Sequence, residues 1–203
     1  MDWRTLSCLL LLGAVAVSSV LLAGNVTQRH EWTQINRIDS QQQAERVQKI
    51  LQYLKYPQLG KNDSLQVGAW SAESRVLLLW YFASWCWNCN QEIPELSNIY
   101  AQYQSSGFDI LGIGVYSPVV ELQQFREKYG ITFPIVVGPS RVKVLDSRQH
   151  TMHYTLRKMV GDQRTWGTPF HIFIVNDDSV SIFSAPGEIR SHDLRRFLDT
   201  YLN

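Results

Sequence analysis

The hydrophobic and polar positions along the chain alternate between continuous apolar runs and amphipathic stretches. Residues 76–82, 108–115 and 133–137 have the unbroken hydrophobicity of strands that are covered on both faces of a sheet. Amphipathic segments at 87–103 and 119–129 lie between them and predict helices. Strands that alternate with helices in this way indicate a parallel sheet with right-handed crossovers.

The C-terminal part adds further elements of the same kind. Two apolar runs, 170–175 and 180–184, are joined by the polar turn Asn-Asp-Asp-Ser and predict paired strands. Residues 190–202 form an amphipathic pattern that predicts a closing helix, and 141–160 carries apolar residues that suggest buried helical content. A short strand is also expected at 66–70.

A separate helix is predicted before the domain, at residues 40–56. Its apolar residues recur at spacings of three and four, and Ser40 with Gln43 provides a capping box at its start. Pro57 and Gly60 then end it. The helix is either a stalk or a helix that packs on the domain, and packing is the commoner role of an amphipathic helix.

The N-terminus carries an apolar run at residues 6–23, which is about long enough to span a bilayer. We interpret residues 1–25 as a signal anchor in preference to a cleaved signal peptide, because the run is long for a signal peptide. Cys8 lies inside this run and has no expected catalytic part. We therefore expect a stalk or amphipathic helix over 26–60 and a single domain over 61–203.

Composition limits the range of functions. With 203 residues, 45% of them hydrophobic, the chain can bury one good core. The net charge of +1 gives no field that favours nucleic acid. Aromatic residues make up 12% of the chain, and Trp85 and Trp87 flank a cysteine, where their rings can provide a contact surface for an extended substrate.

The candidate chemistry lies in Cys86 and Cys89, two cysteines separated by two residues where a strand gives way to a helix. The helix N-terminus favours an anion, so the pKa of Cys86 should fall below its ordinary value. Cys89 would be the resolving thiol. A zinc site needs four ligands and the chain has no second such pair, and a structural disulfide across so short a loop would add little stability. A redox-active pair is the favoured interpretation.

The segment from Phe82 to Leu96, with its W-C-x-x-C-x-x-E-I-P sequence, resembles the active site of thioredoxin-fold oxidoreductases. It is most similar to the membrane-anchored TlpA/ResA/DsbE-like branch, and Gly167-Thr168-Pro169 resembles that family's cis-proline loop. The resemblance covers residues 65–203. One departure is that Trp87 and Asn88 stand between the cysteines, where this branch often has a proline, which affects the expected redox potential.

The resemblance implies a thioredoxin-like α/β fold, with a central mixed β-sheet flanked by helices, and no bound cofactor. It implies that Glu92 modulates the thiols as an acid or base, and that Thr168 and Pro169 form the other wall of the site, where the Thr168 backbone pairs with substrate. It further implies a bacterial cell-envelope protein, anchored in the inner membrane with its domain in the periplasm. Such proteins keep protein thiols reduced, often those of apocytochrome c, and exchange electrons with a membrane thiol partner.

Three alternatives remain open from the residues. The protein could instead be an oxidase or isomerase that forms disulfides, a copper- or zinc-binding chaperone, or a peroxide-reducing relative. His150 and His153 have the spacing of metal ligands on a helix but lack an evident third ligand, so we expect them to be solvated. His171 is expected to be packed in a strand rather than catalytic.

Overall fold

The computed structural model describes residues 32–140 and 145–202. Glu31–Asn203 forms one compact unit, so the domain boundary that we placed at residue 61 lies inside this unit. The apolar run at 6–23, the predicted anchor and Cys8 lie outside the described residues. Within the part that the structure describes, no helix is both long enough and apolar enough to cross a membrane.

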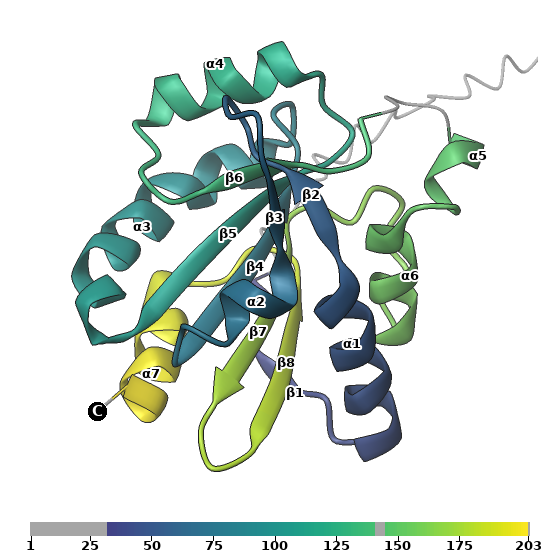
Figure 1. Ribbon diagram of the computed structural model, residues 1–203. Coiled ribbons are helices and arrows are strands. Elements are labelled where there is room, and N and C mark those ends of the chain that lie inside the picture. Colours follow the sequence, from purple (N-terminus) through teal and green to yellow (C-terminus); the bar gives the residue numbers. More distant parts are fainter. Residues whose placement is uncertain (1–31, 141–144, 203) are drawn as a thin grey trace, which may run out of the picture. The chain divides into compact units, whose positions relative to one another are not determined.

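The described residues include a six-stranded mixed sheet with the strand order β1-β8-β7-β4-β5-β6 (Figure 1). Strands β4, β5 and β6 are parallel, whereas β7 runs antiparallel to β4, β8 to β7 and β1 to β8. The fold class predicted from the sequence is thus confirmed. The strands are β1 (Asn36–Arg37), β4 (Val76–Phe82), β5 (Phe108–Gly114), β6 (Ile135–Val137), β7 (Phe170–Asn176) and β8 (Val180–Pro186).

Helices cover both faces of the sheet, which explains why all seven residues of β4 are buried. Alternate side chains along a strand point to opposite faces, so Trp80 and Phe82 enter one hydrophobic cluster and Tyr81 enters the other. Helices α3 (Trp87–Tyr103), α4 (Val119–Tyr129) and α7 (Ser191–Leu202) contribute to the first cluster. Helix α1 (Gln41–Tyr53) and helix α6 (Met152–Met159) contribute to the second.

The predicted helices occur close to their expected bounds, and α4 ends as expected at Gly130. This residue has a left-handed φ of 58°, and its backbone N–H donates to carbonyls of the last turn. Such a conformation strongly favours glycine and stops the helix. The segment 141–160 contains α6 and the short helix α5 (Leu145–Arg148), which agrees with the helical content expected there.

Helix α1 packs on the sheet rather than standing apart as a stalk. Val47 and Leu51 are buried in the second cluster, and the Ser40 hydroxyl accepts a hydrogen bond from the Gln43 backbone N–H. The helix ends at Tyr53, earlier than predicted, and Lys55–Pro57 forms strand β2. These residues pair with strand β3 (Ser64–Gln66), which holds them extended and accounts for the early end.

The strand predicted at 66–70 is wrong. Strand β3 covers Ser64–Gln66, and Val67–Ser71 forms the short helix α2. Strand β3 pairs only with the three-residue β2 among the described residues, so its length is limited by that partner. Val67 is the first residue of this helix and is buried, and its backbone N–H donates to the carbonyl of Leu54.

Candidate active site

The two cysteines lie where β4 ends and α3 begins, as the sequence predicted. Cys86 is the N-cap residue of α3, and its sulfur accepts a hydrogen bond from the backbone N–H of Cys89 at 3.3 Å. Cys86 retains 7% of its surface exposed, whereas Cys89 has 0%. Both are free thiols in this structure. Only one sulfur of the pair is therefore open to a molecule that approaches from outside.

The environment of Cys86 lowers its pKa from 9.0 to about 7. The largest cause is a hydrogen bond from the Cys89 thiol, which stabilises the Cys86 thiolate, and burial opposes it. Hydrogen bonds from the Thr168 side chain and the Cys89 backbone lower the pKa further, and the charge of Glu92 raises it. The predicted fall is confirmed, but its main cause is the neighbouring thiol rather than the helix dipole alone.

Burial acts in the opposite direction on Cys89 and raises its pKa well above 9.0. Its hydrogen bond to Cys86 and the charge of Cys86 raise the pKa further, and the charge of Glu92 adds a smaller contribution. The two thiols therefore ionise far apart in pH. At neutral pH about half of Cys86 is a nucleophilic thiolate while Cys89 keeps its proton.

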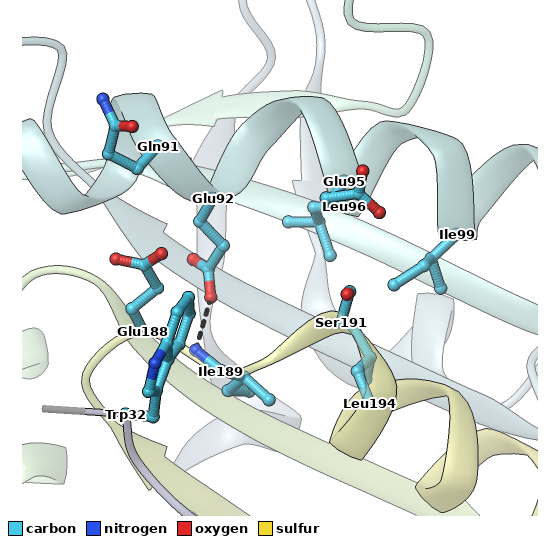
Figure 2. A pocket seen from close by; sticks show the side chains of 10 residues that line it. All are labelled: Trp32, Gln91, Glu92, Glu95, Leu96, Ile99, Glu188, Ile189, Ser191 and Leu194. Atoms are coloured by element: carbon cyan, nitrogen blue, oxygen red, sulfur yellow. Dashed lines mark hydrogen bonds between the residues drawn. The ribbon is translucent and has the colours of Figure 1, made fainter. Parts of the chain in front are cut away.

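Glu92 lies one turn beyond Cys89 on the inner face of α3 and is 7% exposed. Its carboxylate accepts a hydrogen bond from Trp80 Nε1 at 2.9 Å and one from the Ile189 backbone N–H at 3.0 Å. Figure 2 shows the carboxylate pointing from α3 towards the Ile189 nitrogen, among the side chains that line a pocket of about 90 Å³. Glu92 is thus held in place by buried donors rather than exposed on the helix surface.

The loop before β7 forms the other side of the site. The Thr168–Pro169 peptide bond is cis, as predicted, and the Thr168 side chain reaches Cys86. Gly167 has a left-handed φ of 65°, and a Cβ there would collide with the buried guanidinium of Arg157. Arg157 donates to Asp162 at 2.7 Å and to the Trp166 carbonyl at 3.3 Å. This buried ion pair fixes the loop that carries Thr168.

Three tryptophans lie in the segments that carry the cysteine pair and Thr168. Trp87 is 63% exposed, and Trp85 is 36% exposed and donates from Nε1 to the Tyr116 carbonyl at 2.9 Å. Trp166 packs edge-on against Trp85 with 5.3 Å between ring centroids. The sequence analysis named Trp85 and Trp87 but not Trp166, whose position two residues before Thr168 was the available signal.

The expectation that both histidines of the 150–153 pair are solvated is wrong for His153. His150 is exposed, but His153 is fully buried, lies 3.0 Å from the Tyr116 hydroxyl and stacks on Tyr81. Burial lowers its pKa to about 3. The reason is that α6 packs on the sheet and turns His153 inward. Across residues 32–140 and 145–202, no cluster of three or more His, Cys, Asp or Glu side chains is arranged to hold a metal ion.

Comparison with known families identifies the chain. The model of the AhpC/TSA family matches residues 52–158, which is more than half of the chain and includes both cysteines. The chain belongs to the AhpC/TSA family. The thioredoxin-like expectation from the sequence is therefore confirmed at the level of the family.

Within this AhpC/TSA family protein, the region around the cysteines is similar to thiol-disulfide oxidoreductases named ResA. The Geobacillus thermodenitrificans protein is 37% identical over 57 residues, which is 28% of this chain and 33% of that protein. The Bacillus subtilis protein is 31% identical over 75 residues, which is 37% of this chain and 41% of that protein. The matched segments thus span about a third to two fifths of these relatives.

Solved structures share the fold over most of the chain. A secreted Mycobacterium tuberculosis disulfide oxidoreductase, homologous to E. coli DsbE, superimposes with a TM-score of 0.54 and 19% identity, covering 75% of this chain and 98% of that one. A putative thiol:disulfide interchange protein DsbE from Chlorobium tepidum gives 0.55 and 18%, covering 74% and 93%. At such low identity the likeness establishes the thioredoxin-like fold alone.

Proposed function

We propose that this protein is a thiol-disulfide oxidoreductase in which Cys86 is the nucleophile and Cys89 the resolving thiol. The observation that carries the proposal is the contrast between the two sulfurs. Cys86 is partly accessible with a pKa of about 7, whereas Cys89 is buried with a pKa raised well above 9.0. A reactive thiolate next to a protonated partner is what stepwise exchange requires.

As a reductant, the protein would act in two steps. The Cys86 thiolate attacks one sulfur of a substrate disulfide, a bond forms between them, and the other substrate sulfur leaves as a thiolate. Cys89 then loses its proton and attacks Cys86, which forms the Cys86–Cys89 disulfide and releases the second substrate sulfur. Two electrons pass to the substrate, and a dithiol donor must return them. Glu92, one turn from Cys89, is the proposed acid or base for that proton.

We propose that the substrate is a protein segment in extended conformation. Thr168 and Pro169 lie opposite Cys86, where the Thr168 backbone would pair with the segment. The indole rings of Trp85 and Trp87 would contact the side chains on either side of the reacting disulfide, and the exposure of Trp87 supports this role.

The pKa of Cys86 supports a reductant, which passes electrons to its substrate, rather than an oxidant. A nucleophilic cysteine in thioredoxin has a pKa near 7, whereas that of the strong oxidase DsbA is about 3.5. A strong oxidant has a stabilised reduced form. Here the pKa is about 7, so the dithiol form gains little from ionisation at neutral pH.

The cellular setting that we propose rests on the sequence. The apolar run at residues 6–23 supports export and anchoring in a bacterial inner membrane, with the domain in the periplasm. A membrane thiol protein would then supply the electrons, and apocytochrome c is one candidate among protein substrates.

Wild type and two variants of the full-length chain in detergent test the proposal, with insulin as a disulfide probe. Wild type should reduce insulin when dithiothreitol is supplied, and Cys86→Ser should lose this activity. Cys89→Ser should accumulate a mixed disulfide with insulin, because its resolving thiol is gone. Equal activity in wild type and Cys86→Ser would refute the assignment.

The reduction potential of the pair tests the direction. A value near that of thioredoxin, about -270 mV, would support a reductant, whereas a value near about -120 mV would make the protein a disulfide-forming enzyme.

A further inference from the structure

Glu92 has a buried partner that the sequence did not reveal. His171 lies on β7 directly opposite Trp80 of β4, so both side chains enter the cluster beneath α3. Its Nε2 atom lies 3.0 Å from the Glu92 carboxylate, and its ring is fully buried. The two residues are 79 positions apart in the chain. The sheet register alone brings them together.

The hydrogen bonds of His171 determine where its protons lie. Nδ1 is 3.1 Å from the backbone carbonyl oxygen of Ala185. Because a carbonyl oxygen only accepts, Nδ1 must carry a hydrogen. In a neutral ring, Nε2 would then present a lone pair to Glu92, and two lone pairs repel at 3.0 Å. A proton therefore lies between Nε2 and the carboxylate.

We propose that Glu92 and His171 hold one exchangeable proton between them, and that this pair supplies the Cys89 sulfur with its proton when the Cys86–Cys89 disulfide opens. The inference rests on the proposed thiol-disulfide function and assigns His171 as a positioning residue within it.

The protons and electrons balance as follows. An incoming thiolate forms a bond with the Cys86 sulfur, the Cys86–Cys89 bond breaks, and its electron pair moves to Cys89. Burial makes a Cys89 thiolate unfavourable, so it takes the shared proton. The pair is left as a carboxylate and a neutral imidazole, with Trp80 and Ile189 still donating to the carboxylate. In the reverse direction the pair first releases its proton to water and then accepts the proton of Cys89.

Water can resupply the proton through the pocket beside α3. Glu92 lines this pocket together with Glu95 and Glu188, as Figure 2 shows. Those two carboxylates and the thiols of Cys86 and Cys89 are the titratable groups that face the pair from α3 and from the loop before α7.

The test compares His171→Gln and Glu92→Gln, singly and together, in the full-length chain. The glutamine amide at position 171 can donate to Glu92 but cannot transfer a proton, so the carboxylate stays ionised. His153→Gln is the matched control, because His153 is also fully buried but belongs to the opposite face of the sheet. The first readout is the rate at which dithiothreitol reduces the Cys86–Cys89 disulfide. Tryptophan fluorescence monitors this reaction, and the rate is measured across the pH range in which histidine and thiol groups titrate.

For wild type and His153→Gln, we expect the reduction rate, divided by the concentration of dithiothreitol thiolate, to fall as pH rises and the pair loses its proton. His171→Gln and Glu92→Gln should each be about 100-fold slower at low pH and lack this pH step. The double variant should be no slower than either single one, because the two residues act as a unit. A His171→Gln profile identical to wild type, or additive losses in the double variant, would overturn the proposal.

Nitrogen-15 NMR of the histidine rings provides a readout that needs no activity. We expect His171 Nδ1 to carry a hydrogen at every pH, and the protonation of Nε2 to change in Glu92→Gln. An Nε2 signal that does not respond to Glu92→Gln would also refute the proposal that Glu92 and His171 share a proton. If wild type fails to reduce insulin, the proposed function fails, while the NMR result still decides whether the pair shares a proton.

Discussion

The low pKa of Cys86 should depend on the hydrogen bond from Cys89, and this gives the sharpest prediction for the site. Cys89→Ala removes the largest cause of the shift, whereas Cys89→Ser keeps a donor at the same position. The pKa of Cys86 should therefore rise towards 9.0 in the alanine variant and stay low in the serine variant. With Cys8→Ser added to both, each variant has the single thiol of Cys86, so its titration belongs to Cys86.

The size of the effect follows from the two pKa values. With a pKa of about 7, about half of Cys86 is thiolate at pH 7, compared with about 1% for a pKa of 9.0. Thiolate abundance alone thus favours the serine variant by about 50-fold. A thiolate of lower pKa is a weaker nucleophile, by about 6- to 10-fold over this interval. The net difference in alkylation rate at pH 7 is therefore about 5- to 8-fold.

The assay is the rate of iodoacetamide alkylation as a function of pH, with the midpoint as the primary readout because it does not depend on nucleophilicity. We expect a midpoint near pH 7 for Cys89→Ser and a higher one for Cys89→Ala. Equal midpoints in the two variants would show that the Cys89 side chain does not set the pKa. A midpoint of 9.0 in Cys89→Ser would refute the whole account of the site.

The same shift predicts a pH-dependent stability of the dithiol form. The folded pKa of Cys86 is lowered, so between about pH 7 and pH 9 the unfolded state binds more protons and stability rises with pH. A two-unit shift corresponds to about 2.7 kcal/mol, which is fully present above pH 9.0 and lost as pH falls through about 7. Denaturant unfolding of Cys86→Ala should lack this slope, and an unchanged slope would contradict the prediction.

Three further substitutions test the surrounding structure by denaturant unfolding. Leu51→Ala should lower the free energy of unfolding by about 2–5 kcal/mol, because Leu51 is buried against the sheet. Tyr53→Ala, at an exposed residue of the same helix, is the control. Equal costs for the two variants would mean that α1 is not packed on the sheet. Gly167→Ala should cost about 3–5 kcal/mol, because the new Cβ displaces Arg157 and breaks its buried pair with Asp162; near-neutral behaviour would exclude the clash. Trp80→Phe should cost about 1–3 kcal/mol through the lost donor to Glu92, beyond the effect of a Trp70→Phe control, whose indole N–H has no hydrogen-bond partner among the described residues.

Local sequence patterns specify much of this site. The spacing of Cys86 and Cys89 and the junction between an apolar run and an amphipathic segment place the pair at a helix start. The same kind of pattern places the strands, and the resemblance places Thr168 and Pro169 beside the thiols. These features depend on residues close together in the chain, or on a motif that a known family shares.

The exact lengths of the short elements depend on their partners instead. Strand β3 ends at Gln66 because β2 offers only three residues for pairing, and no local preference of 66–70 reveals that limit. His153 likewise has the sequence context of a surface residue, since its burial depends on how α6 packs against Tyr81 and Tyr116.

The partner of Glu92 depends entirely on tertiary structure. His171 lies within a nearly continuous apolar run, which does not show the face of the sheet to which each side chain points. The antiparallel register sets His171 opposite Trp80, and a shift of one residue would turn it to the other face. Local sequence therefore specifies which chemistry the thiols can perform, whereas long-range strand pairing selects the groups that hold the proton beside them.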